Sequence, residues 1–495
     1  MLKRKTIAIL FPCSLIALAP LICYAQTHFA VDSYGLAYHY DVHSASFLGA
    51  YRYVGALLIR LWTLFFDPIR NPTADVIVFL IVAALSVAAL SATIIKILEL
   101  KSFLGYIVAV ASVLISVINV WAVNILTFPE CIVLYAFGIM FCFFAVICYF
   151  YDKIGKWRFP LSGLLLICSI AIYQQFVSIF MIYTLLLIGA ELMLSKEKSA
   201  KKALERYLSL LAFLLVCFIV YFAVGYVLRQ GAGLGANPRA EFSFAGFVES
   251  LKYYASHQRY LLRGKNFFNS NILRRCYEIL GLIWIVAVVC GLFKNGFSVK
   301  TLIVLLTFPA AYAAAYLPGL ISTHDGVRVV MGLFSVFALF AIGSLAFYRR
   351  RWIALCLALL LVFVYGLNIR RDIVMLTEQL SVNADEIALT QKYLDEIKQY
   401  EQSGGVEVKT VVFCCDGHID YLTEKPTGII LMYTLETDWG LAGLLEYVSR
   451  GERGFAVIMK TPQELSDLFG ETDFSEYDPA AQLRFEGDTL YLCIY

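Results

Sequence analysis

The chain has 495 residues, of which 60% are hydrophobic and only 16% are charged, and its mean hydropathy is +0.75. Soluble domains average about 45–50% apolar and about 25% charged residues, so this composition excludes a soluble globular protein and indicates an integral membrane protein. The net charge of +3 favours neither a nucleic-acid partner nor an acidic one.

The first predicted element is a membrane span over residues 6–25, preceded by a Lys-Arg-Lys triplet. The positive-inside rule holds this N-terminus in the cytoplasm. A cleaved signal peptide is the alternative, but the apolar run is long for one and further spans follow. The polar segment after the span, which contains Asp32 and Asp41, is therefore expected on the outer face.

A helix that crosses about 30 Å of hydrocarbon needs about twenty mostly apolar residues. By this rule the sequence predicts about eleven spans, near residues 6–25, 73–98, 103–127, 129–151, 160–173, 175–194, 207–229, 272–293, 301–318, 328–348 and 352–369. The apolar segment 47–66 contains two arginines and is predicted to be one interfacial helix on the outer surface. The connections predicted inside are basic, and most outer ones are not, which supports this topology.

An odd number of spans exports the region after the last one. Residues 370–401 carry apolar residues at helical spacing, which predicts a long amphipathic helix ended by a Gly-Gly pair. The sequence then predicts a strand at 408–415, a helix at 439–449, a strand at 454–460, a helix at 462–469 and a hairpin at 482–495. We therefore expect two domains, a multi-span domain over 1–369 and a small extracytoplasmic α/β domain over 370–495.

Acidic residues at the outer mouth of a membrane protein are candidate functional groups, because they are costly to keep there. Asp32 is the first candidate, as a general base that takes a proton from an acceptor hydroxyl; its alternative role is a helix cap or an ion pair with Arg52. Asp41 is a weaker candidate, since a polar outer loop needs such residues for solubility. Glu130 opens a span, where it either stabilises the helix N-terminus or faces the same outer cavity as Asp32.

Other polar residues at the same height are candidate substrate ligands. Tyr173 and Gln174 interrupt an apolar stretch, and amides with aromatic faces suit sugar recognition. Asp325 and Arg328 precede a late span, where an arginine can bind a lipid phosphate in a bidentate manner; a surface ion pair between them is the alternative.

The long outer loop over residues 229–271 is cationic and aromatic, with Arg263 and Lys265 among its basic residues. A phosphate or diphosphate headgroup would suit such a loop. A solvated surface loop that touches lipid headgroups is the alternative.

The 13 cysteines are scattered, and no CxxC pair occurs, so no zinc site is predicted. A disulfide from Cys414 or Cys415 to Cys493 remains open outside the cell. The sequence requires no cofactor and does not exclude a divalent metal.

Several short motifs, taken in order, resemble one family. They are Asp32 within Phe29–Tyr34, Gly49 followed by Arg52, Phe128-Pro129-Glu130, the run Ser169–Gln174 and Val327-Arg328-Val329. The chain is similar in these positions to the bacterial multi-span glucosyltransferases that modify surface polysaccharides, as in O-antigen modification (Gtr-type). The resemblance covers most of residues 1–400. Similar proteins often have paired acids where this chain has Asp32-Ser33, and an adjacent Gly-Arg pair.

The resemblance implies a GT-C-like helical architecture and transfer of a hexose, in particular glucose, from a polyprenyl-phosphate donor to a cell-surface glycan. The reaction would take place on the outer face of the cytoplasmic membrane. Partners implied are the donor lipid, the glycan acceptor, membrane lipids, a synthase that makes the donor and a flippase that exports it. A polysaccharide polymerase or ligase, and a lipid-linked glycan transporter, are the alternatives.

Overall fold

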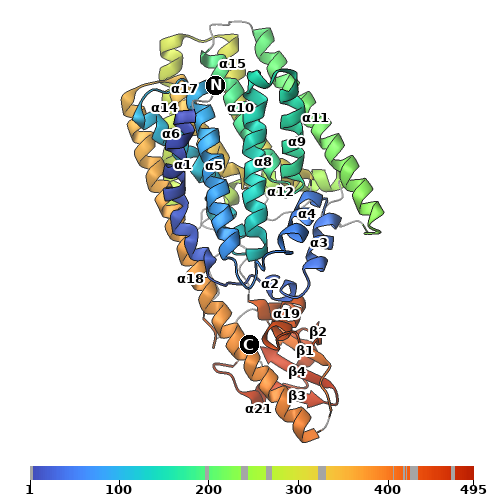
Figure 1. Ribbon diagram of the computed structural model, residues 1–495. Coiled ribbons are helices and arrows are strands. Elements are labelled where there is room, and N and C mark those ends of the chain that lie inside the picture. Colours follow the sequence, from blue (N-terminus) through green and yellow to red (C-terminus); the bar gives the residue numbers. More distant parts are fainter. Residues whose placement is uncertain are drawn as a thin grey trace.

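The computed structural model describes residues 4–194, 200–235, 243–263, 270–321, 331–404, 406–415, 419, 421–423, 433–469 and 474–494. Most of them form a helical bundle, and a small sheet lies beyond one end of it (Figure 1). The N-terminal end of helix α1 lies at the opposite end of the bundle from this sheet.

Ten helices form the first half of the described chain: α1 (Arg4–Leu18), α2 (Ser33–Leu36), α3 (Tyr40–Gly49), α4 (Tyr53–Trp62), α5 (Thr73–Ile97), α6 (Phe103–Val117), α7 (Val120–Leu126), α8 (Ile132–Phe150), α9 (Arg158–Ile170) and α10 (Phe176–Leu194). The second half contains α11 (Ala200–Gly231), α12 (Phe244–Arg263), α14 (Asn271–Asn295), α15 (Val299–Leu305), α16 (Thr307–Ile321), α17 (Gly332–Phe347), α18 (Arg351–Gly404), α19 (Asp438–Val448), α20 (Pro462–Leu465) and α21 (Pro479–Gln482). Short 3-10 turns include η1 (Ala19–Ala25), η2 (Pro129–Cys131), η3 (Asp152–Trp157) and η6 (Thr434–Glu436).

Nine helices in the described part of the chain are long and apolar enough to cross a membrane, which marks the chain as a membrane protein. Two of the expected spans, 160–173 and 328–348, are not among these nine, since α9 has 13 residues and α17 has 16, whereas α1, α6 and α16 reach membrane length together with the helical turns that adjoin them. The helical character of these segments is therefore confirmed, whereas the number of spans stays a prediction.

The expectation of one interfacial helix over 47–66 is wrong. The chain breaks between α3 and α4 at Tyr51, whose φ of 60° lies in the left-handed region that a non-glycine residue rarely adopts. The Tyr51 ring packs against Gly225 of α11, where a side chain would collide with it. Packing against α11 thus fixes a turn that helical periodicity alone does not reveal.

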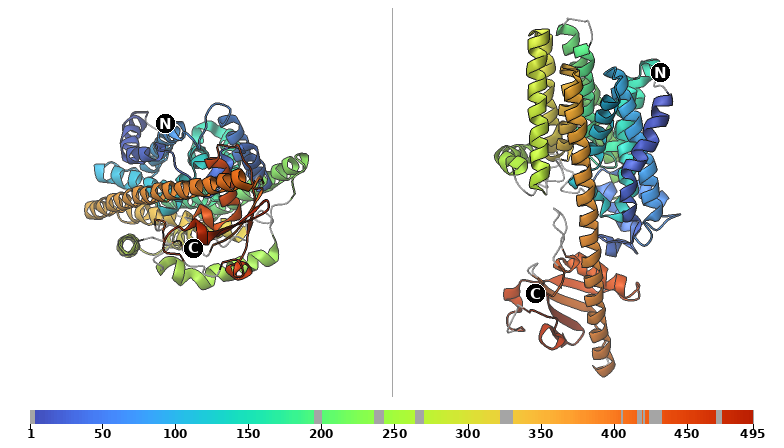
Figure 2. Two further views of the ribbon diagram at one scale, coloured as in Figure 1. Left: turned by 90° about the horizontal axis from the view of Figure 1, so that it is seen from below. Right: turned by 90° about the vertical axis from the view of Figure 1, so that its left-hand side faces the viewer.

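Helix α18 joins the bundle to the sheet. Its 54 residues form one helix of about 80 Å at 1.5 Å per residue, so the last predicted span and the predicted amphipathic helix are continuous across position 369. Figure 2 shows this helix running out of the bundle and along the sheet. Its apolar first part packs in the bundle, and its second part covers one face of the sheet.

The predicted C-terminal strands and hairpin are confirmed. Four strands, β1 (Thr410–Cys415), β2 (Ala456–Met459), β3 (Leu483–Glu486) and β4 (Thr489–Ile494), lie in the order β2-β1-β4-β3. Strand β1 is parallel to β2 and β4, whereas β3 and β4 form an antiparallel hairpin that turns at Gly487 with a φ of 60°. Cys414 and Cys493 are opposite each other in the register of β1 and β4.

The hydrophobic core of the sheet region includes residues from the start of the chain. Phe29 and Tyr34 are buried together with Leu441 and Leu444 of α19 and with residues of α18. The rings of Phe29 and Tyr34 stack with their centroids 4.3 Å apart, and the ring of Tyr447 contacts both in an edge-to-face arrangement. The segment after the first helix is therefore built into the C-terminal fold as well as into the bundle.

Candidate functional site

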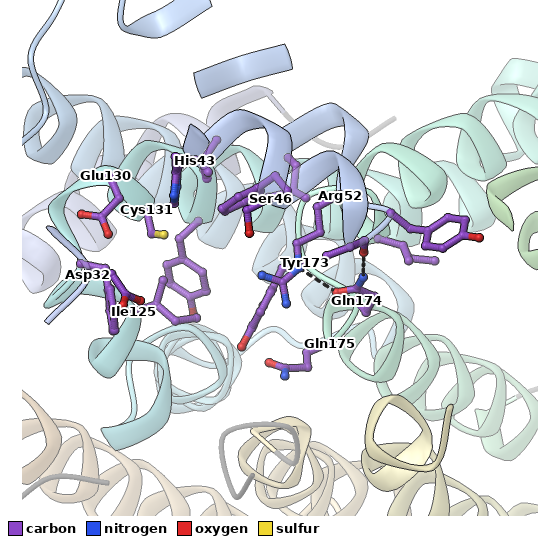
Figure 3. A pocket seen from close by; sticks show the side chains of 18 of the residues that line it. Asp32, His43, Ser46, Arg52, Ile125, Glu130, Cys131, Tyr173, Gln174 and Gln175 are labelled. Atoms are coloured by element: carbon purple, nitrogen blue, oxygen red, sulfur yellow. Dashed lines mark hydrogen bonds between the residues drawn. The ribbon is translucent and has the colours of Figure 1, made fainter. Parts of the chain in front are cut away.

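A cavity of about 650 Å³ lies where the bundle meets α19. It is bounded by the loop before α2, by α3, α7, α8, α10 and α11, and by the first turn of α19. Figure 3 shows polar side chains from several of these elements pointing into it.

Five of the residues singled out in the sequence line this cavity. They are Asp32, Arg52, Glu130, Tyr173 and Gln174. They come from four separate segments, so the fold brings together residues that the sequence separates by more than a hundred positions. Their chemical roles remain predictions.

Of the other predicted site residues, only Asp41 has a side chain that the structure describes. Asp41 is exposed on α3 and is not among the residues that line the cavity, because the helix turns it away while His43 faces inward. Lys265, Asp325 and Arg328 lie outside the described residues, and Arg263 is the last residue of α12, with a side chain that is likewise outside the description.

Asp32 is exposed to the cavity and held by one aromatic partner. It occupies the N-cap position of α2, but its side chain makes no capping hydrogen bond there among the described residues. Instead, Oδ1 accepts a hydrogen bond of 3.0 Å from Nε1 of Trp439 in α19. The bond to Trp439, rather than the helix-capping role considered from the sequence, therefore positions this carboxylate.

The segment that carries Asp32 is fixed by hydrogen bonds from two sides. Nε2 of His28 lies 3.0 Å from the carbonyl oxygen of Leu126, at the end of α7. Asn383 of α18 accepts from the Phe29 backbone N–H at 2.9 Å and donates to its carbonyl at 3.1 Å, and Gln379 donates to the same carbonyl at 2.7 Å. Because these bonds are buried, the backbone before Asp32 has little freedom.

Glu130 is the buried acid of the cavity wall, with an exposed fraction of 1%. It lies in the 3-10 turn before α8, and Oε2 accepts a hydrogen bond of 2.9 Å from Oγ of Ser33. Ser33 Oγ in turn accepts from the backbone N–H of Ala30 at 3.1 Å. The residue next to Asp32 in the sequence is thus hydrogen-bonded to Glu130, and both acids line one cavity, which was one of the two alternatives for Glu130.

Arg52 and Gln174 form a hydrogen-bonded pair on the other side of the cavity. Nε of Arg52 donates to Oε1 of Gln174 at 3.0 Å, and the amide nitrogen of Gln174 donates to the carbonyl of Ala50 at 2.8 Å and to the Tyr221 hydroxyl at 3.2 Å. The guanidinium lies 4.9 Å from the ring centre of Tyr173. A planar cation fixed in this way can bind an anion.

Arg229 is a second cation near this wall that the sequence reasoning did not identify. Its exposed fraction is 7%, and Nε and Nη1 have no hydrogen-bond partner within the described part of the chain. The guanidinium lies 5.1 Å from the ring centre of Tyr51, the neighbour of Arg52. Burial of a guanidinium without a paired anion is costly, so an anion bound here would gain a strong partner.

His43 lines the cavity between the acids and Arg52 (Figure 3). Burial, and then the positive charge of Arg52, lower the pKa of His43 from 6.5 to about 4. The imidazole is therefore neutral at physiological pH, and its buried Nε2 lacks a hydrogen-bond partner among the described residues. A neutral imidazole in this position can bind a hydroxyl group without adding charge.

Together, these groups suit a substrate that carries both hydroxyls and a negative charge. The cavity has two carboxylates on one side, a cation on the other, and amide, imidazole and aromatic groups between them. Such a combination can bind a sugar, hold an anionic leaving group and accept a proton.

The fold and this cavity define the class of protein: a helical membrane protein with a cavity that contains several polar side chains at one end of its bundle. Comparison with family models identifies the particular family. The chain matches the model of the glucosyl transferase GtrII over residues 24–339, and it belongs to this family. The protein is thus a glycosyltransferase. A search of curated proteins finds no match to the chain.

The matched region contains every residue that lines the cavity except Trp439. The sequence reasoning also missed Trp439, which it treated only as the start of a helix. No local signal distinguishes this residue, because its contact with Asp32 joins positions 407 residues apart.

Proposed function

We propose that this glycosyltransferase moves glucose from a polyprenyl-phosphate donor to a cell-surface glycan on the outer face of the cytoplasmic membrane. The observation that carries the proposal is the convergence of Asp32, Glu130, Arg52 and Gln174 on one cavity at the end of an apolar bundle. A lipid-linked donor can place its chain among the helices and its sugar phosphate in this cavity.

Arg52 binds the phosphate of the donor in this proposal. Its guanidinium is oriented by Gln174 and Tyr173 before the substrate arrives, and an oriented cation stabilises charge that develops on a leaving group. Arg229, whose guanidinium lies over the Tyr51 ring, supplies a second positive charge.

Asp32 is the general base. It takes the proton of the acceptor hydroxyl, while the acceptor oxygen forms the new bond to the anomeric carbon of glucose. The bond from that carbon to the phosphate oxygen breaks, and polyprenyl phosphate leaves with the bonding electron pair. General-base catalysis of this kind contributes about 10²- to 10⁴-fold to a rate.

Glu130 and His43 orient the donor sugar. Glu130 has one oxygen committed to Ser33, which leaves the other to accept from a sugar hydroxyl. Neutral His43 offers Nε2 to a second hydroxyl. A site that discriminates between sugars requires hydrogen-bonding groups in fixed positions, and the bond to Ser33 fixes Glu130 in this way.

The test uses purified protein in nanodiscs with polyprenyl-phosphate-[14C]glucose and a surface polysaccharide from the bacterium that carries the gene. We expect the wild type to transfer label to the polysaccharide and Asp32→Asn to lose transfer. Asp467→Asn is the matched control, since Asp467 is exposed in the C-terminal region, far from the cavity lining. Failure of the wild type to transfer sugar from any lipid-linked donor would overturn the proposal.

A further inference from the structure

Trp439 belongs to the cavity but comes from outside the family match, which ends at residue 339. The residue is 57% exposed, although large aromatic side chains are normally buried. Its Nε1 donates to Asp32, so one edge of the ring is fixed at the acid while much of the ring remains accessible.

The position of Trp439 is set by a close approach of two backbones. A Cβ added to Gly443 of α19 would lie 2.4 Å from the backbone nitrogen of Gly35 in α2. A Cβ on Gly440, one residue after Trp439, would lie 2.4 Å from the carbonyl oxygen of Thr434. Gly443 therefore allows α19 to lie directly on α2, the helix that Asp32 precedes, and Gly440 allows the turn before α19 to pack closely against the first turn of the helix.

Further contacts prevent α19 from sliding along α2. His39, just after α2, lies 3.0 Å from Oε1 of Glu446 in α19. Glu386 of α18 binds the turn before α19, accepting from the backbone and the hydroxyl of Thr434. These contacts fix the backbone of α19, and the bond to Asp32 fixes the indole of Trp439.

A fixed, accessible indole beside a carboxylate suits a sugar ring. The C–H face of a pyranose is apolar and slightly positive, and it packs well on the negative face of an aromatic ring. The hydroxyls at the rim of the same sugar ring reach a neighbouring carboxylate. Because Oδ1 of Asp32 is occupied by the indole, Oδ2 remains to take a proton from such a hydroxyl.

Within the proposed function, on which this inference rests, we propose that the C-terminal region carries the acceptor subsite. A sugar of the acceptor glycan stacks on Trp439 and presents its hydroxyl to Asp32. The donor occupies the opposite side, where Arg52 and Gln174 lie within the helical bundle that holds its lipid chain. The sheet region lies beyond one end of the bundle, and under the proposed topology this is the outer side, where the cell-surface glycan is.

The experiment separates ring stacking from the hydrogen bond. Trp439→Ala removes both, whereas Trp439→Phe keeps a ring but loses the N–H donor. We expect Trp439→Ala to raise the KM for the acceptor polysaccharide about five- to tenfold with an unchanged KM for the donor. Trp439→Phe should keep most of the acceptor affinity and lower kcat, because Asp32 loses its orienting bond.

Trp157→Ala is the matched control, since Trp157 is also strongly exposed but lies in η3, away from the cavity. A Trp439→Ala variant whose donor KM rises while its acceptor KM is unchanged would place the donor on this ring and overturn the proposal. So would equal effects of Trp439→Ala and Trp157→Ala on acceptor KM.

A second experiment tests the subsite even if no transfer occurs. Calorimetry measures binding of the polysaccharide, without donor, to the full chain in nanodiscs. If the wild type binds the polysaccharide and Trp439→Ala does not, the subsite is supported even where the transferase proposal fails. A wild type that binds no polysaccharide, or a variant that binds it equally well, would contradict the subsite.

Discussion

The bundle wall and the C-terminal wall of the cavity are built in different ways. The bundle wall combines membrane-length helices such as α8 and α10 with the short helices α3 and α4, and it carries Arg52, Glu130 and Gln174, all within the family match. The C-terminal wall is the first turn of α19, held on α2 by two glycines and a shared aromatic core. Asp32 lies between them, bonded to the C-terminal wall and joined through Ser33 to the bundle wall.

Under the proposed function, the two walls bind different substrates. A lipid-linked substrate needs a wall that continues into the membrane, whereas a soluble glycan needs one that projects from it. A transferase that joins the two substrates benefits from placing its base at the boundary. Variants in each wall, and at the boundary, test whether the two walls have separate effects on the kinetics.

The largest expected effect is at the boundary itself. Asp32→Asn keeps the size of the side chain but cannot accept the hydroxyl proton, so we expect kcat to fall about 10²- to 10⁴-fold. Because Asp32 is exposed, thermal unfolding should be nearly unchanged. Initial rates of transfer from radiolabelled donor measure the first quantity. Retention of full activity would move the base elsewhere, with Glu130 the next residue to test.

On the bundle wall, Arg52→Gln removes the cation that we propose to face the leaving phosphate. We expect kcat/KM for the donor to fall about 100-fold, the usual cost of losing one oriented charge-stabilising group, while the KM for the acceptor is unchanged. Arg60→Gln is the control, because Arg60 is exposed on the helix that follows Arg52 and does not line the cavity. An increase confined to the acceptor KM would contradict the assignment of this wall to the donor.

On the C-terminal wall, Gly443→Val forces α19 away from α2, since the added Cβ would lie within 2.7 Å of two backbone atoms of Gly35. We expect a loss of about 2 kcal/mol or more in the stability of this contact and a marked fall in transfer. Faster proteolysis of the C-terminal region would report the loosened contact. Gly454→Val, where no atom lies within 4 Å of an added Cβ among the described residues, should change neither. Equal effects of the two variants would argue against the close helix contact.

The most narrowly confined effect, which appears only at acidic pH, concerns the imidazole of His43 in the cavity. The folded protein holds the pKa of His43 near 4, below its usual value of 6.5, so the unfolded chain binds a proton between these pH values and the folded chain does not. The contribution of His43 to the free energy of unfolding is therefore fully present above pH 6.5. It falls by about 3 kcal/mol as the pH drops to about 4. His43→Phe should flatten the dependence of Tm on pH over this window. Parallel curves for the variant and the wild type would show that His43 is not held neutral.

Local patterns in the sequence predicted much of this molecule. Apolar runs located the long helices, and alternation with turn residues located the four strands and the hairpin turn at Gly487. Polar residues at the outer ends of apolar runs correctly indicated groups that line a cavity, including Asp32, Glu130 and Gln174. The same argument selected Asp41, which is exposed on α3 and does not line the cavity. This prediction failed because position in the sequence alone does not determine which side of a short helix faces inward.

Contacts between distant segments were not predictable in this way. The left-handed turn at Tyr51 depends on Gly225, and the position of Trp439 depends on Gly35 and Gly443. Arg229 looked like the end of a helix in the sequence, and only its stacking on Tyr51 shows that it is buried beside the site. Each of these features depends on close contact between residues that are far apart in the sequence, and no local periodicity reveals such a contact.

The sequence by itself determined that this chain enters a membrane as a set of apolar helices and ends in a small α/β fold, because hydropathy and periodicity are local properties. It also determined the chemical groups available for transfer. Only the tertiary structure decided which of them meet, since the hydrogen bonds from Phe29 to Asn383 and from Trp439 to Asp32 join positions 354 and 407 residues apart. Side-chain packing and backbone approach, rather than sequence spacing, place the acid between the two walls.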